Sequence, residues 1–132
     1  MAGPIINAPA PGNAPTLLLY SFTPKEQGAF RFLLRGFPGI RLIAVPETAY
    51  ELSLRELLAE TQPREAAVCR AFSRHMLVLA HIPEPLAHPL IAICKQATSE
   101  KVLKAMLTET NQHWTSQVLY QNLLEEEAQL GG

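Results

Sequence analysis

The run LLLY at residues 17–20 decides the fold, because a similar run, MLVL, stands at residues 76–79. Each run is apolar and is followed four residues later by a proline, Pro24 or Pro83. Continuous apolar runs of this length are typical of strands that are covered on both faces of a sheet. Both the runs and the prolines are 59 residues apart, which indicates two divergent copies of one unit.

Further matches later in the chain extend this internal repeat. They lie 62 residues apart, so three residues are gained between the two sets of matches. The pairs are Glu47-Thr48 with Glu109-Thr110, Leu52-Ser53 with Trp114-Thr115, and Leu57 with Leu119.

The first copy is predicted to cover residues 16–60. Its opening strand should end near Phe22, where Thr23 caps a helix and Glu26 completes a capping box. A second strand follows at residues 40–45, and Ser53 with Glu56 forms a second capping box for a helix that ends near Glu60.

The second copy is predicted to cover residues 75–128 with the same order of elements. Strands are expected at residues 76–80 and 102–107, a helix after Pro83, and a last helix that Thr115 caps. Residues 61–74 are predicted to form a connecting helix, and residues 1–15, which are rich in proline and alanine, a flexible tail.

This order of elements predicts an α/β fold made of two tandem β-α-β-α repeats related by a pseudo-twofold axis. Each strand-helix-strand step should be a right-handed parallel crossover, so four strands form a small parallel or mixed sheet packed with helices. They lie either in one sheet or in two apposed sheets. One repeat cannot bury its apolar surface alone, so we expect both to form one compact domain.

Composition excludes several classes of function. The 132-residue chain has a formal net charge of -1, so no basic surplus would neutralise nucleic-acid phosphates. No window approaches the roughly 18 consecutive apolar residues of a membrane helix. Cys69 and Cys94 form no CxxC motif, which favours a reducing compartment. We therefore expect a soluble cytoplasmic protein that binds neither nucleic acid nor membrane.

Two segments, LLLYSFTPKE at residues 17–26 and LTETNQHWTSQVL at residues 107–119, resemble the two halves of a small bacterial domain family of unknown function. The first copy keeps the serine and phenylalanine of the family's opening turn, Ser21 and Phe22, together with Glu26. The second has Ala80 and His81 in their place but keeps the loop residues Thr108, Thr110, Asn111, Trp114 and Thr115. The resemblance implies the fold and no reaction.

The loop at residues 108–114 is the best candidate site, because ligands of parallel α/β sheets gather beyond the carboxyl ends of the strands. Polar and aromatic side chains converge there: Thr108, Thr110, Asn111, His113, Trp114 and Thr115. A structural explanation competes, in which Thr115 caps a helix, Trp114 staples it and Asn111 forms a turn. Tyr20 and Phe22 either line an aromatic surface beside this loop or pack in the core.

Other potential sites have simpler explanations. The four histidines, His75, His81, His88 and His113, match no metal-ligand spacing, so we expect no metal and surface or capping roles. Cys69 and Cys94 fit small buried apolar residues better than reactive thiols. No catalytic constellation, phosphate loop or cofactor motif is present in the sequence.

The sequence therefore favours a non-catalytic interaction or regulatory module that uses its sheet edges or its last helices to bind itself or a partner protein. The rival hypothesis is a small-molecule-binding protein or enzyme with its site at residues 108–114. A pocket at that loop would support the rival, and an exposed apolar patch on the last helix would support a partner protein.

Overall fold

A computed structural model of the chain describes residues 14–59 and 72–131. These residues contain one sheet with the strand order β2-β1-β3-β4. The strands are β1 (Thr16–Tyr20), β2 (Arg41–Ala44), β3 (His75–Ala80) and β4 (Val102–Met106). β1 is parallel to β2 and β3 is parallel to β4, whereas the central pair β1 and β3 is antiparallel. The predicted α/β class with a mixed sheet is confirmed, and the four strands lie in one sheet.

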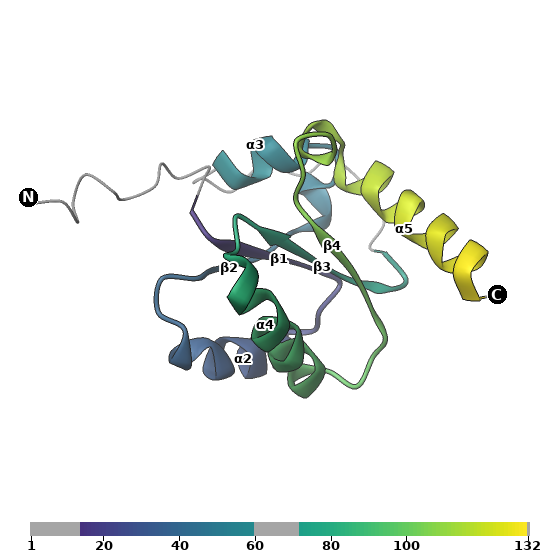
Figure 1. Cartoon of the computed structure of the whole chain (residues 1–132). Helices are drawn as coiled ribbons and strands as arrows, with labels where there is room; N and C mark the ends of the chain where they lie inside the picture. Colours follow the sequence, from purple (N-terminus) through teal and green to yellow (C-terminus); the bar gives the residue numbers. More distant parts are fainter. Residues whose placement is uncertain (1–13, 60–71, 132) are drawn as a thin grey trace, which may run out of the picture.

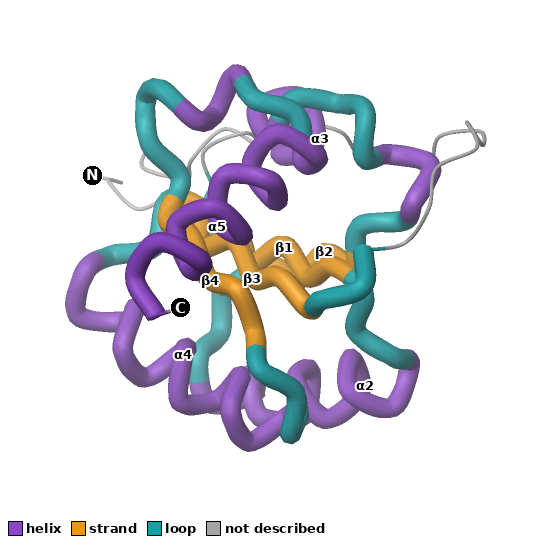
Figure 2. Tube along the Cα trace, turned by 90° about the vertical axis from the view of Figure 1, so that its right-hand side faces the viewer, coloured by secondary structure: helices purple, strands orange, loops and turns teal. Residues whose placement is uncertain are grey.

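Helices cover both faces of this sheet (Figure 1). The helices α2 (Pro24–Leu33) and α4 (Glu84–Ala97) lie below it, while α3 (Leu54–Ala59) and α5 (Ser116–Gly131) lie above it. Figure 2 shows the strands as a middle layer between these two pairs. The end of α5 projects beyond the sheet (Figure 1). None of the described helices combines the length and the apolar character needed to cross a bilayer.

The central strands explain the two apolar runs. Leu18 and Val78 face the upper layer, whereas Leu17 and Leu77 face the lower one, and all four side chains are buried. Because helices cover both faces of these strands, neither face needs polar residues and the sequence lacks the alternation of a half-exposed strand. The two central strands thus hold two separate apolar layers together.

Three predicted helix caps are present. Thr23 accepts a hydrogen bond from the Glu26 amide while the Glu26 carboxylate accepts one from the Thr23 amide, at 3.1 and 2.8 Å. Ser53 and Glu56 form the same reciprocal pair at 3.1 and 3.0 Å. Thr115 accepts from the Val118 amide at 3.2 Å. These caps fix where the helices begin.

The turns after the two central strands show that the predicted alignment of the two copies was wrong at this point. Tyr20 ends β1 and Ala80 ends β3, and the next residues, Ser21 and His81, have positive φ angles of 68° and 56°. His81 therefore takes the place of Ser21, so the alignment that put Ala80 there was wrong by one residue. Strands buried on both faces have no polar alternation that fixes such a register.

The predicted tail and connecting helix fall largely outside the described residues. Of residues 61–74, the structure describes only Phe72, Ser73 and Arg74, and these three are not helical, so a helix does not extend to Arg74. Phe72 instead stacks on Tyr120 in the upper layer, with ring centroids 3.9 Å apart. Cys69 also lies outside the described residues.

Candidate functional site

Asn111 organises the loop that follows β4. Its side-chain oxygen accepts a hydrogen bond from the Thr108 amide at 2.7 Å, and its side-chain nitrogen donates to the Met106 carbonyl at 2.9 Å. The Asn111 amide donates to the Thr108 hydroxyl at 3.0 Å. Asn111 is itself buried, so its polar atoms are committed to the loop rather than presented to a ligand.

The end of the same loop joins the two halves of the chain. Thr115 forms an isolated antiparallel bridge with Ser53, and the Trp114 carbonyl accepts a hydrogen bond from the Leu54 amide at 2.9 Å. Trp114 is partly buried and packs against the upper layer, to which Leu119 also belongs. Of the remaining loop residues, Thr108, Thr110 and His113 are exposed.

Tyr20 and Phe22 lie on opposite faces of the sheet and form no common surface. The Tyr20 hydroxyl shares a buried hydrogen bond of 2.8 Å with Ser116, directly after the loop. Phe22 packs in the lower layer, with its ring centroid 4.8 Å from that of His75. Both aromatic side chains are buried, which accords with core packing.

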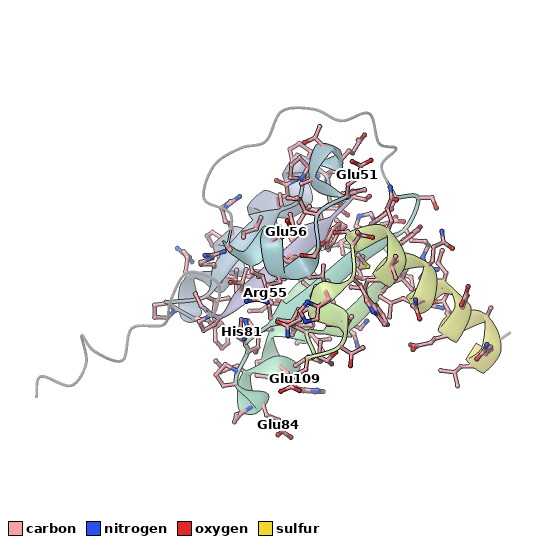
Figure 3. The ribbon with its side chains drawn as sticks, turned by 90° about the horizontal axis from the view of Figure 1, so that it is seen from above. Glu51, Arg55, Glu56, His81, Glu84 and Glu109 are labelled. Carbon is pink, nitrogen blue, oxygen red and sulfur yellow. The ribbon has the colours of Figure 1, made fainter. Side chains whose placement is uncertain are left out.

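A depression lies where β3 and β4 end. His81, Thr108, Glu109 and Gln112 line it, together with apolar residues that include Met106. Seen from above, His81, Glu84 and Glu109 lie at one end of the molecule, and Arg55 of α3 lies toward the same end (Figure 3). Within the described residues the His81 ring has no hydrogen-bond partner, so the depression offers an imidazole and a carboxylate to solvent.

A polar network that the sequence did not reveal lies below the sheet. The Glu26 carboxylate accepts hydrogen bonds from His75 Nε2 at 2.8 Å and from the Thr98 hydroxyl. Burial alone would raise the pKa of the Glu26 carboxyl group. Hydrogen bonds from Thr98, the Thr23 amide and His75 outweigh this effect of burial and lower the pKa to about 2. Glu26 and His75 are 49 residues apart, and no local pattern links them.

This network lacks the order of a nucleophilic triad. In such a triad the base contacts the nucleophile, whereas here His75 and Thr98 bind separate oxygens of Glu26 and do not activate each other. The network instead joins the start of α2, the start of β3 and the end of α4. Its geometry therefore fits a structural role, in which hydrogen bonds hold these three elements together.

The other histidines and the described cysteine offer little chemistry. His81, His88 and His113 are exposed. Over residues 14–59 and 72–131, no three His, Cys, Asp or Glu side chains are placed to hold a metal ion. Cys94 is a buried free thiol, and burial raises its pKa to about 11, which keeps it protonated near neutral pH.

The two edges of the sheet differ in how their backbone groups are covered. At β4 the Leu107 amide bonds to Leu79 of β3, so the groups of Val102, Lys104 and Met106 point outward. The Met106 carbonyl accepts from Asn111, and the Val102 carbonyl accepts from the Lys104 ammonium at 3.3 Å. Side chains thus occupy two of the three outward carbonyls of this edge.

The β2 edge lacks such protection. The amides of Arg41 and Val45 bond to the β1 side, at Pro15 and Leu19, so the backbone groups of Leu42 and Ala44 point outward. In the part of the chain that the structure describes, these outward groups have no hydrogen-bond partner. The strand is apolar except for Arg41 and contains neither proline nor lysine.

Comparison with known proteins gives a match to a family model. Residues 75–130 match the model of a family described as a domain of unknown function, DUF3783. This match covers β3, α4, β4 and α5, and therefore the loop that Asn111 organises. The chain matches no curated protein and no solved structure. The second half of this chain is thus similar to a domain family whose function is itself unknown.

Proposed function

We propose that this chain is a non-catalytic interaction module that binds a protein by adding a strand to the β2 edge of its sheet. The carrying observation is that the outward backbone groups of Leu42 and Ala44 have no hydrogen-bond partner among residues 14–59 and 72–131. An exposed edge of this kind is a template for another strand, since its main-chain groups supply affinity for an extended segment.

The candidate loop supports a structural role over catalysis. The Asn111 side chain forms hydrogen bonds within the loop and to the β4 edge, Thr115 caps α5, and Trp114 packs on the core. The last helix offers no continuous apolar patch to a partner, because Leu123 and Leu124 pack on the upper layer. Its exposed apolar residues, Val118 at 44% and Leu130 at 87%, lie near opposite ends of α5. The β2 edge is therefore the stronger candidate for an interface.

We also infer that the chain arose by duplication of one β-α-β-α unit and that it acts in the cytoplasm. Two depressions support the duplication, one at the ends of β1 and β2 and one at the ends of β3 and β4. Their linings correspond at offsets of 60 and 62 residues: Leu19 with Leu79, Ser21 with His81, Ala44 with Met106, Glu47 with Glu109, and Tyr50 with Gln112. The free thiol of Cys94 accords with a reducing compartment.

Site-specific photo-cross-linking in cells tests the proposed interaction. A photoreactive residue replaces Ala44 on the β2 edge, and in a matched chain it replaces Met106, which takes the corresponding position on β4. We expect a discrete adduct from Ala44 and none from Met106, because side chains cover the Val102 and Met106 carbonyls of the β4 edge, whereas the outward groups of β2 have no partner among the described residues. Mass spectrometry of the adduct identifies the bound protein.

Two results would overturn the proposal. Absence of any protein adduct at Ala44 would leave the β2 edge without a partner. Equal labelling from Ala44 and Met106 would show collision rather than recognition, because two of the three outward carbonyls of the β4 edge are covered.

A second candidate function is the binding of a small polar molecule in the depression that His81 and Glu109 line. The observation that favours it is His81, an exposed residue with a positive φ and a ring without a partner in the described part of the chain. Strained residues of this kind cluster at functional sites. A thermal-shift screen against metabolites tests it, with loss of the hit in His81→Ala and Glu109→Gln as the criterion.

A further inference from the structure

We propose that the protein that occupies the β2 edge is a second copy of this chain, whose own β2 pairs antiparallel with the first. This inference rests on the proposed function and adds the partner and the register. The two sheets would join into one continuous eight-stranded sheet, with a twofold axis at Ile43.

The backbone of β2 is complementary to itself in this register. Leu42 and Ala44 are the residues whose amides and carbonyls point outward. An antiparallel pair centred on Ile43 places Leu42 opposite Ala44 of the other copy, and Ala44 opposite its Leu42. Each of these pairs exchanges two hydrogen bonds, as opposed residues do at hydrogen-bonded positions of an antiparallel ladder. All outward groups of the strand would therefore find partners.

The side chains of β2 also fit this arrangement. Ile43 would meet its own counterpart, and cross-strand pairs of branched apolar residues stabilise antiparallel sheets. Arg41 would lie opposite Val45 rather than another cation. Its guanidinium is also held within its own chain, where it donates to the Leu58 carbonyl at 3.2 Å. No like charges oppose each other between the two paired β2 strands.

The β4 edge would not support the same pairing. If the β4 strands of two copies paired antiparallel about their central residue, Lys104 would lie directly opposite Lys104 of the other copy. Like charges at such positions are destabilising. The carbonyls of Val102 and Met106 already accept hydrogen bonds from Lys104 and Asn111. Lysines on edge strands prevent strand pairing in many sheets. The chain thus has one edge that favours a second copy and one that opposes it.

The mass in solution as a function of concentration tests this inference on the purified full chain. Light scattering after size exclusion should give a mass that rises from 14.6 kDa toward twice that value as the concentration increases. Ala44→Pro removes one outward amide and keeps the bond from the Val45 amide to Leu19, so it should give 14.6 kDa throughout. The matched control, Met106→Pro, removes an outward amide from β4 and should dimerise like the native chain.

Hydrogen exchange of the native chain keeps the test independent of the folding of either variant. The amides of Leu42 and Ala44 should exchange slowly in concentrated samples and quickly on dilution, while the inward amide of Val45 stays protected in both. Slow exchange that does not change with dilution would mean that another part of the same chain covers the edge, and the inference would fail.

The inference also fails if the native chain keeps a mass of 14.6 kDa up to roughly 1 mM, or if Ala44→Pro still dimerises. A monomeric chain that nevertheless gives a discrete cross-link from Ala44 to a different protein in cells would overturn the second copy as partner while leaving the proposed function intact. Absence of both dimer and cross-link would overturn both.

Discussion

Glu26 and His75 meet across the lower layer at 2.8 Å, with only 16% and 13% of their side chains exposed. Hydrogen bonds to the Glu26 carboxylate outweigh its burial and hold its pKa near 2, below its ordinary value of 4.5. A carboxyl group with a lowered pKa in the folded state stabilises that state above its unfolded pKa, and this contribution disappears as the pH falls. We expect a loss of about 2 kcal/mol between pH 5 and pH 2, measured by urea unfolding at each pH.

A substitution distinguishes the contribution of Glu26 to the pH dependence of stability from the contributions of the other carboxyl groups. Glu26→Gln cannot ionise, so its unfolding free energy should be lower at neutral pH by about 1–3 kcal/mol and should depend less on pH between 5 and 2. Glu125→Gln, which changes an exposed carboxylate of α5, serves as the control and should keep the native pH profile. An unaltered pH profile in Glu26→Gln would contradict this role for the carboxylate.

The hydrogen bond between Tyr20 and Ser116 should couple the sheet to α5. Tyr20→Phe leaves the buried Ser116 hydroxyl without its partner, so we expect a loss of about 1–2 kcal/mol. Ser116→Ala alone should cost a similar amount. The double variant should cost less than the sum of the two single variants, because no polar atom is then left unpaired. Strict additivity in chemical denaturation would exclude this coupling.

Asn111 should act on stability. Asn111→Ala removes bonds to Thr108 and Met106, and we expect a loss of about 1–3 kcal/mol. Asn111→Asp should also destabilise, since a carboxylate cannot donate to the Met106 carbonyl. Thr110→Ala, at an exposed neighbour, should stay within about 0.5 kcal/mol of the native chain. An Asn111→Ala variant as stable as Thr110→Ala would return Asn111 to the list of ligand-binding candidates.

Local signals in the sequence were sufficient to predict the four strands and the helices that pack on the sheet. The capping boxes of Thr23 with Glu26 and of Ser53 with Glu56 depend on residues three positions apart, and both are present. The apolar runs predicted the two central strands, since a parallel or central strand covered on both faces needs no polar side chain. These features follow from chemistry within a few residues of chain.

Relationships between distant residues could not be predicted in this way. Continuous apolar runs do not fix the register, so the turn at His81 was misplaced by one residue. The contact between Glu26 and His75 depends on the antiparallel pairing of β1 with β3, which brings Tyr20 opposite Met76. The protection of the β4 edge by Asn111 likewise depends on how the loop folds back onto Met106.

Cys94 should resist alkylation in the folded protein. Burial raises the pKa of its thiol to about 11, so roughly one thiol in a thousand is ionised at pH 8, and solvent hardly reaches it. In a Cys69→Ser background, iodoacetamide should label Cys94 only when denaturant unfolds the chain, as mass spectrometry would reveal. Rapid labelling of the native chain would contradict the burial of this helix face.

Replacement of His81 with glycine should stabilise the protein, because His81 adopts a positive φ of 56° that costs a residue with a side chain about 1 kcal/mol. Glycine relieves this strain but is more flexible in the unfolded chain, so we expect a net gain of about 0.5 kcal/mol. Ser21→Gly relieves the same strain at a φ of 68° but removes the 2.8 Å hydrogen bond from the Ser21 hydroxyl to the Phe72 carbonyl, so it should be neutral or destabilising. Thermal unfolding of both variants distinguishes strain from hydrogen bonding, since equal gains would mean that the bond to Phe72 contributes nothing. If His81→Gly gains stability and also loses a ligand found by thermal shift, His81 is held in this conformation for binding.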